Sequence, residues 1–123
     1  MQNNEIIFYR NEQGECPLLD FLNSLDKKMN AKVMRTIKLL RDNGNDLREP
    51  YSKALSDGIF ELRIKVGSDI SRVLYFFVVG NKIVLTNGFV KKTQKTPSAE
   101  IARAKHYRTD YLYRTQNDKR KEK

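Results

Sequence analysis

The segment from residue 58 to residue 77, GIFELRIKVGSDISRVLYFF, constrains the fold more than any other part of the chain. In its first half, Phe60, Leu62, Ile64 and Val66 share one parity, whereas Ile59, Glu61, Arg63 and Lys65 share the other. Because successive side chains of a strand point to opposite faces, this alternation predicts a strand with one apolar face and one charged face. A turn at residues 67–69 and a second strand that carries Arg72 follow. The charged face is either an ordinary solvated surface or a functional site.

The net charge of +9 is confined to the second half of the chain. Residues 1–60 hold nine Lys/Arg and nine Asp/Glu, whereas residues 61–123 hold fifteen and six, which gives the whole excess of +9. The last ten residues contribute +3 (five basic and two acidic), so +6 remains in the rest of the chain. A one-sided basic charge favours a polyanionic partner, nucleic acid above all, over a tail that only keeps the protein soluble.

Composition excludes several other classes of protein. A single cysteine cannot form an internal disulfide, and it fits a reducing, cytoplasmic setting. No apolar run approaches the roughly 20 residues of a membrane span, and one cysteine with one histidine does not make a usual zinc site. We therefore expect no membrane association, no metal and no cofactor. The length predicts one domain, over residues 1–113, followed by a basic, disordered tail over residues 114–123.

Periodicity and turn residues predict the order βααβββα. We expect strands at 5–9, 59–66, 71–79 and 83–89, and helices from Cys16-Pro17, over 27–42 with Asp26 as cap, and from Thr96-Pro97 with Thr96 as cap. Residues 45–57 are interpreted as a connection, and the lysines of the 27–42 helix as a solvated face. The fold class is α+β: an antiparallel sheet packed by an N-terminal helical hairpin, with a C-terminal helix.

The charged face has the chemistry of a site for single-stranded RNA. Arg63, Lys65 and Arg72 lie on neighbouring strands, and Lys91, Lys92 and Lys95 follow the last strand. Guanidinium groups match phosphates, and Tyr75, Phe89 and Tyr107 are candidate stacking partners for bases. Such a site can cut RNA without a metal if a base takes the proton of a ribose 2′-OH and cations stabilise the phosphorane. The base is left open between Glu61, a lysine with a lowered pKa, and His106, for which a surface role is the main alternative.

Five motifs together resemble a known family. DFLNSL (20–25), PYSKAL (50–55), DGIFELRIK (57–65), SRVLYFF (71–77) and GFVKKTQKTP (88–97) are similar to the phage-derived HigB group of the RelE/ParE toxin superfamily. The resemblance covers about residues 4–112 and implies a βααβββα toxin of a type II toxin–antitoxin pair that cleaves mRNA on the ribosome without a metal. It also implies a helix-turn-helix, HigA-like antitoxin, with operator DNA bound only by the toxin–antitoxin complex.

The resemblance assigns roles to particular residues. It gives the chemistry to Arg63, Arg72 and Lys92, with Glu61 and Lys65 beside them, and the YoeB-like branch suggests Glu49 as a further base. The alternative is a ParE-like member that inhibits gyrase without enzymatic activity, or a nucleic-acid-binding regulator. The cationic residues favour RNA cleavage, since the gyrase inhibitors lack them.

Overall fold

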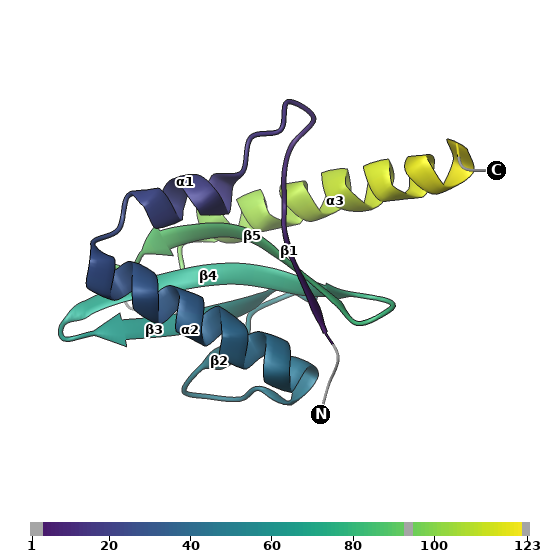
Figure 1. The fold of residues 1–123 in the computed structure, drawn as a ribbon. Coiled ribbons are helices and arrows are strands. Elements are labelled where there is room, and N and C mark those ends of the chain that lie inside the picture. The colour runs from purple at the N-terminus through teal and green to yellow at the C-terminus, as the bar shows by residue number, and fades with distance from the viewer. Residues whose placement is uncertain (1–3, 93–94, 122–123) are drawn as a thin grey trace.

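A computed structural model shows an α+β fold in which a five-stranded sheet lies between two helical layers (Figure 1). It describes residues 4–92 and 95–121, with side chains described up to residue 116. Helices α1 (Pro17–Asn23) and α2 (Lys27–Asn43) cover one face of the sheet, and α3 (Ser98–Lys121) covers the other. The predicted α+β class and the three helices are confirmed, and Asp26 caps α2 as expected, since its carboxylate accepts from the Met29 amide.

The sheet differs from the predicted one at both edges. Its order is β1 (Glu5–Phe8), β5 (Lys82–Val90), β4 (Asp69–Val78), β3 (Phe60–Val66) and β2 (Ser52–Ala54). The central meander β3–β4–β5 is antiparallel, as predicted, but β1 pairs parallel with β5, so the sheet is mixed. Strand β2 lies in the segment that was expected to be a connection, just after the short 3-10 helix η1 (Gly44–Asp46).

Alternation along β3 separates two cores, as the sequence predicts. Leu62 and Ile64 pack with α1 and α2, whereas Ile59 packs with Leu74, Phe76 and Ala104 on the α3 side. The charged parity of β3 therefore faces the α3 layer. Helix α1 packs on β5 and α2 on β3, so each expected member of the helical hairpin rests on its own strand.

Two local features of β5 position the helices. A Cβ at Gly88 would lie 2.3 Å from the Phe21 ring, so only glycine lets α1 sit this close to the strand. The register of β5 against β4 shifts between Val73 and Tyr75. Beside this bulge the Asn87 amide donates to the backbone and carboxylate oxygens of Glu100, at 3.2 and 3.0 Å. These two hydrogen bonds of Asn87, beside the bulge, tie β5 to the first turn of α3.

The start and the end of α3 differ from the expectation. Pro97 precedes the helix, and the Thr96 hydroxyl, expected to cap it, instead donates to Glu61 at 2.5 Å. At the other end, α3 continues through residue 114 to Lys121, so the expected boundary of the tail does not coincide with the end of an element. The division into domain and tail stays a prediction.

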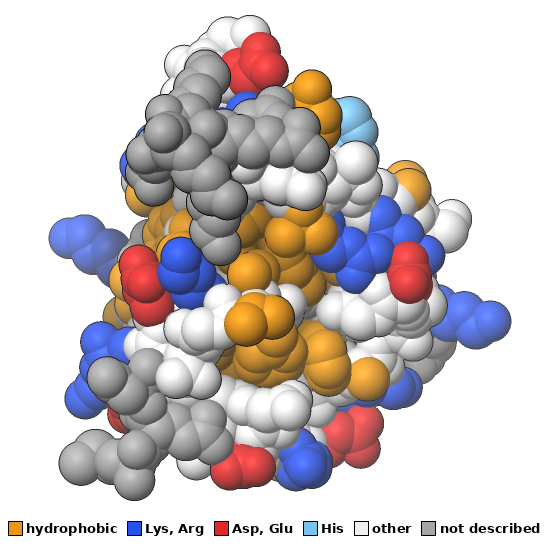
Figure 2. All heavy atoms as spheres, turned by 90° about the vertical axis from the view of Figure 1, so that its right-hand side faces the viewer, with side chains coloured by type: hydrophobic (Ala, Val, Ile, Leu, Met, Phe, Trp, Pro, Cys, Tyr) orange, Lys and Arg blue, Asp and Glu red, His pale blue; other side chains and the backbone are white. Residues whose placement is uncertain are grey.

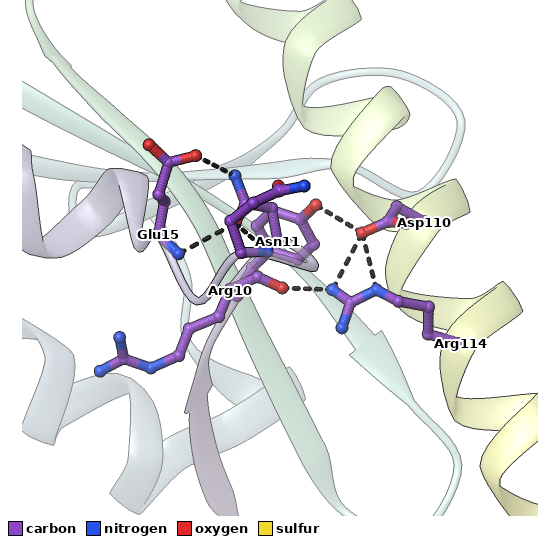
Figure 3. Close-up of polar contacts among 7 residues, drawn as sticks. Arg10, Asn11, Glu15, Asp110 and Arg114 are labelled. Atoms are coloured by element: carbon purple, nitrogen blue, oxygen red, sulfur yellow. Dashed lines mark hydrogen bonds and ion pairs between the residues drawn. The ribbon is translucent and has the colours of Figure 1, made fainter.

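A polar cluster fastens α3 to the end of β1 (Figure 3). Asp110 accepts from the Tyr9 hydroxyl at 2.6 Å and from Arg114 Nε at 3.0 Å, and Arg114 also donates to the Arg10 carbonyl. Asn11 and Glu15 close the loop beside them through two hydrogen bonds. We call Tyr9, Asp110 and Arg114 the closed cluster.

The end of the sheet at the β4–β5 turn is apolar at its surface. Figure 2 looks onto the end that carries the β4–β5 turn, where hydrophobic side chains gather in the middle of the face and Val79 is 96% exposed. Within the described part of the chain, no helix is long and apolar enough to cross a membrane, and no cluster of three potential metal ligands is found.

Candidate nucleic-acid site

Glu61 is the centre of the charged face. Its side chain is only 2% exposed, and both of its carboxylate oxygens have partners. Oε2 lies 3.4 Å from Arg63 Nε, whereas Oε1 lies 3.5 Å from Arg72 Nε and accepts the Thr96 hydroxyl. A carboxylate held from three sides positions its partners, so the geometry makes Glu61 the group that orients the two arginines.

The two arginines are paired directly across the sheet. Arg63 of β3 stands opposite Arg72 of β4 in the antiparallel register. Like charges in this position repel, so the pair requires the carboxylate of Glu61 between them. Arg72 is 6% exposed, and burial lowers the pKa of its guanidinium, an effect opposed by Glu61 and increased by Arg63. We call Glu61, Arg63, Arg72 and Thr96 the open cluster, because it borders a cavity.

That cavity has a volume of about 270 Å³ and an excess of positive charge. Glu61 and Thr96 line it together with four basic residues: Lys53, Arg63, Lys91 and Lys95. Burial lowers the pKa of Lys91 most, and the Arg72 charge lowers it further. Glu61 raises this pKa and Arg63 and Lys53 lower it by smaller amounts, so the net effect is a lowered pKa. The cavity therefore offers fixed cations for an anion and one amine that is predisposed to lose its proton.

The predicted site residues fall into two groups. Arg63, Arg72, Glu61, Lys91 and Lys95 come together, and Glu49 joins them at the rim, 3.7 Å from Arg63. Lys65 lies one step further along β3, where it lines a neighbouring hollow with Arg63 and Arg72. Lys92 and His106 are exposed and do not belong to the described lining of the cavity.

The predicted stacking residues lie elsewhere. Tyr75 is 1% exposed in the core below α1 and α2, where it stacks on Phe60 and its hydroxyl bonds to Ser52, which corrects its assignment as an RNA contact. Phe89 is 9% exposed and packs in the α3-side core. Tyr107 is stacked on Tyr9 with ring centroids 4.6 Å apart. These rings hold the fold together, and no aromatic residue is described among those that line the cavity.

Two residues of the site were not found by sequence reasoning. Lys53 reaches the cavity from β2, whose three residues are too short to give a recognisable alternation. Thr96 was assigned only a capping role, and nothing in a short polar loop indicates that its hydroxyl reaches a carboxylate on β3.

The comparison with protein families agrees with the motifs that form this site. The family model described as phage derived protein Gp49-like (DUF891) matches residues 20–109, which include β3, β4, β5 and the first half of α3. The chain belongs to the Gp49-like family. This family is part of the RelE/HigB-like toxin group and is associated with toxins of toxin–antitoxin pairs, which in general have an antitoxin as partner. No curated protein matches the chain.

Proposed function

We propose that this Gp49-like protein is an endoribonuclease toxin that cleaves mRNA on the ribosome by attack of a ribose 2′-OH on the adjacent phosphodiester. The observation that carries the proposal is the cavity itself. Arg63 lines it together with a lysine that has a lowered pKa, and the buried carboxylate that fixes Arg63 also holds Arg72. Family membership supports the toxin part of the proposal.

The residues divide the chemistry between them. Lys91 takes the proton of the 2′-OH, the 2′ oxygen then bonds to phosphorus, and the bond from phosphorus to the 5′ oxygen breaks. Arg63 and Arg72 stabilise the charge that develops on the phosphorane oxygens, since both are held in place before the reaction. A lysine of the cavity, Lys53 or Lys95, donates a proton to the leaving 5′ oxygen. Glu61 positions the arginines, so the candidate base moves from Glu61 to Lys91.

Mapping of transcript ends in bacterial cells tests this function. Induction of the wild-type protein is expected to arrest growth and to leave fragments with a 2′,3′-cyclic phosphate and a 5′-hydroxyl. Arg63→Ala should abolish both effects, because it removes a cation of the site. The Arg63 side chain is partly exposed, so the variant is expected to fold. Arg41→Ala is the matched control, since Arg41 is an exposed arginine on α2 that pairs with the neighbouring Asp42.

The outcomes separate the competing functions. Full toxicity of a folded Arg63→Ala protein would overturn the site, and fragments with 5′-phosphate ends would rule out 2′-OH attack. Arrest with intact mRNA and damaged or relaxed DNA would favour the gyrase inhibitor. We further propose that a helix-turn-helix, HigA-like antitoxin neutralises the toxin, which an adjacent reading frame for such a protein would support.

A further inference from the structure

A basic groove lies between α2 and the β3–β4 turn. Lys28, Lys32 and Arg35 follow one another at steps of four and three residues, so they share one side of α2, and all three are exposed. The turn is attached to this side, because Lys32 Nζ donates to the Lys65 carbonyl at 2.5 Å. The hollow between them has a volume of about 550 Å³, and the described residues that line it include five basic and no acidic ones: Lys27, Lys28, Lys32, Arg35 and Lys65.

This groove is continuous with the cavity at Glu61. Lys65 lines the groove and also a hollow of about 240 Å³ that it shares with Arg63 and Arg72. Arg63 in turn lines both that hollow and the cavity at Glu61. The three hollows thus share walls in sequence and lead from the α3 side around the end of β3 to α2. Among the described lining residues, Glu61 is the only carboxylate, and its oxygens are already bound to Arg63, Arg72 and Thr96.

We propose that this basic track (Lys53, Arg63, Lys91 and Lys95 at the cavity, Arg72 and Lys65 at the bend, and Lys27, Lys28, Lys32 and Arg35 along α2) binds the backbone of an RNA strand that extends away from the cavity. The proposal rests on the proposed function, because it takes the strand at Glu61 to be RNA. A strand whose phosphate sits at Arg63 and that leaves the cavity past Lys65 meets further cations along α2.

The composition of the track indicates contact with phosphates and not with bases. Its α2 part offers ammonium and guanidinium groups with small apolar residues such as Ala31 and Val66, and no aromatic ring is described there for a base to stack on. Binding along α2 is therefore expected to be independent of sequence and strongly dependent on salt. This reading replaces the solvated face that helical periodicity alone suggests for these lysines.

Binding of uncleavable RNA to two double variants tests the track. The probes are 2′-O-methyl RNAs of about 4 and about 16 nucleotides, the range that single-strand-binding domains cover. Methylation removes the nucleophile, so binding is measured by fluorescence anisotropy apart from cleavage. Lys28→Ala/Arg35→Ala removes two charges of the track, and Lys38→Ala/Arg41→Ala removes two exposed charges of α2 that line a different groove, beside β1.

The wild-type protein is expected to bind the longer RNA more tightly than the shorter one. Lys28→Ala/Arg35→Ala should lower the affinity for the longer RNA on the order of tenfold at low salt. It should also reduce the slope of log K against log salt by about 1.4, since each single-strand phosphate contact contributes about 0.7. The shorter RNA and the control variant should bind as the wild type does.

Three other outcomes would overturn the track. Equal losses in both double variants, or none in either, would overturn the track while leaving the cavity as the site. If Lys28→Ala/Arg35→Ala weakens binding to polyglutamate but not to RNA, the groove belongs to an acidic protein partner. This result would also overturn the track. Failure of the wild-type protein to bind the longer RNA would overturn the track, whereas the proposed function is rejected separately, by the mapping of transcript ends.

Discussion

The open cluster at Glu61 and the closed cluster at Asp110 are built from the same kinds of groups, yet only one of them is neutral. Each has a carboxylate, a hydroxyl group and arginine, and each lies where α3 meets the sheet. In the closed cluster, one carboxylate is matched by one arginine. In the open cluster, the buried carboxylate of Glu61 faces two arginines and lies in a cavity with three lysines, and the exposed Glu49 at the rim pairs with Arg63 alone.

The difference shows how one chain separates stability from function. Arg114 holds the closed cluster together by donating to Asp110 and to the Arg10 carbonyl, and the carboxylate of Asp110 matches its charge. Arg72 is more deeply buried, yet its Nε has no hydrogen bond, and it shares the counter-charge of Glu61 with Arg63. Glu61 and Arg72 are the buried charges of the open cluster, and the partly exposed Arg63 adds a positive charge beside them. Together with the lysines of the cavity this leaves an excess of positive charge, which favours an anionic ligand. The predictions below test this contrast.

The largest effect is expected at Lys91. Lys91→Ala should lower the rate of RNA cleavage by about 10²–10⁴-fold, the range for loss of a general base. Because burial and the Arg72 charge lower the pKa of Lys91 below its ordinary 10.5, the wild-type rate should rise with pH and level off below that value. Single-turnover cleavage measured across pH checks both statements.

Lys92→Ala is the matched control for Lys91→Ala. Lys92 is the next residue, is exposed, and carries the same charge, but the cavity is lined by Lys91. Its loss should change cleavage only a few-fold. The reverse result, with Lys92 essential and Lys91 dispensable, would support the role that the family resemblance gives to Lys92 and would remove Lys91 as base.

The next largest effect is expected on stability at Glu61. Glu61→Ala leaves Arg72 buried without a counter-charge, so the free energy of unfolding should fall by about 3–5 kcal/mol. Glu49→Ala breaks the ion pair between Arg63 and the Glu49 side chain, which is 64% exposed. This change should lower the free energy of unfolding by no more than about 1 kcal/mol. Urea unfolding followed by circular dichroism measures both. Equal losses would mean that the open cluster has no special buried centre.

A smaller effect on stability is expected at Asp110. Asp110→Asn weakens the bonds from Arg114 and Tyr9, and it should lower the free energy of unfolding by about 1.5–3 kcal/mol without changing the cleavage rate of the folded protein. These bonds, that of Arg114 first, hold the pKa of Asp110 below its ordinary 3.8. The stabilisation is therefore present above that pH and is lost as pH falls through the folded pKa. A cleavage defect beyond the loss of folded protein would contradict the separation of the two clusters.

The open cluster could be predicted in part, because its central residues lie on one regular strand. Alternation placed Glu61 and Arg63 on one face, and the tight turn at residues 67–69 placed Arg72 on the neighbouring strand, where the structure pairs it with Arg63. Tyr75 lies three residues after Arg72, so alternation places the two side chains on opposite faces, yet Tyr75 was named as a stacking partner for bases because of its ring alone. The end of β5 is uncertain by a residue in any reading of the sequence, which is why Lys91 and Lys92 could not be told apart.

The closed cluster could not be predicted at all. Tyr9 and Asp110 are 101 residues apart in the chain, and β1 reaches α3 only because it pairs in parallel with β5. No local pattern encodes such a pairing, and Arg114 was assigned to the predicted tail, outside the domain. Contacts between distant segments depend on the whole fold, and periodicity reports only on near neighbours.

The smallest effect is expected from ionisation of Tyr9. Burial first, and then the hydrogen bond to Asp110, raise the pKa of its phenol to about 12. The fold therefore favours the neutral phenol, and this contribution to stability is fully present below about pH 10 and is lost as pH rises from about 10 to about 12.

Tyr9→Phe should be less stable than the wild type at pH 8 but should lose less stability between pH 9 and pH 11. Urea unfolding at these pH values gives the slopes, and Tyr113→Phe, which removes a phenol that is 65% exposed, is the control. If Tyr9→Phe keeps the wild-type slope, the closed cluster does not protect the phenol, and the contrast between a matched and an unmatched cluster loses its stabilising half.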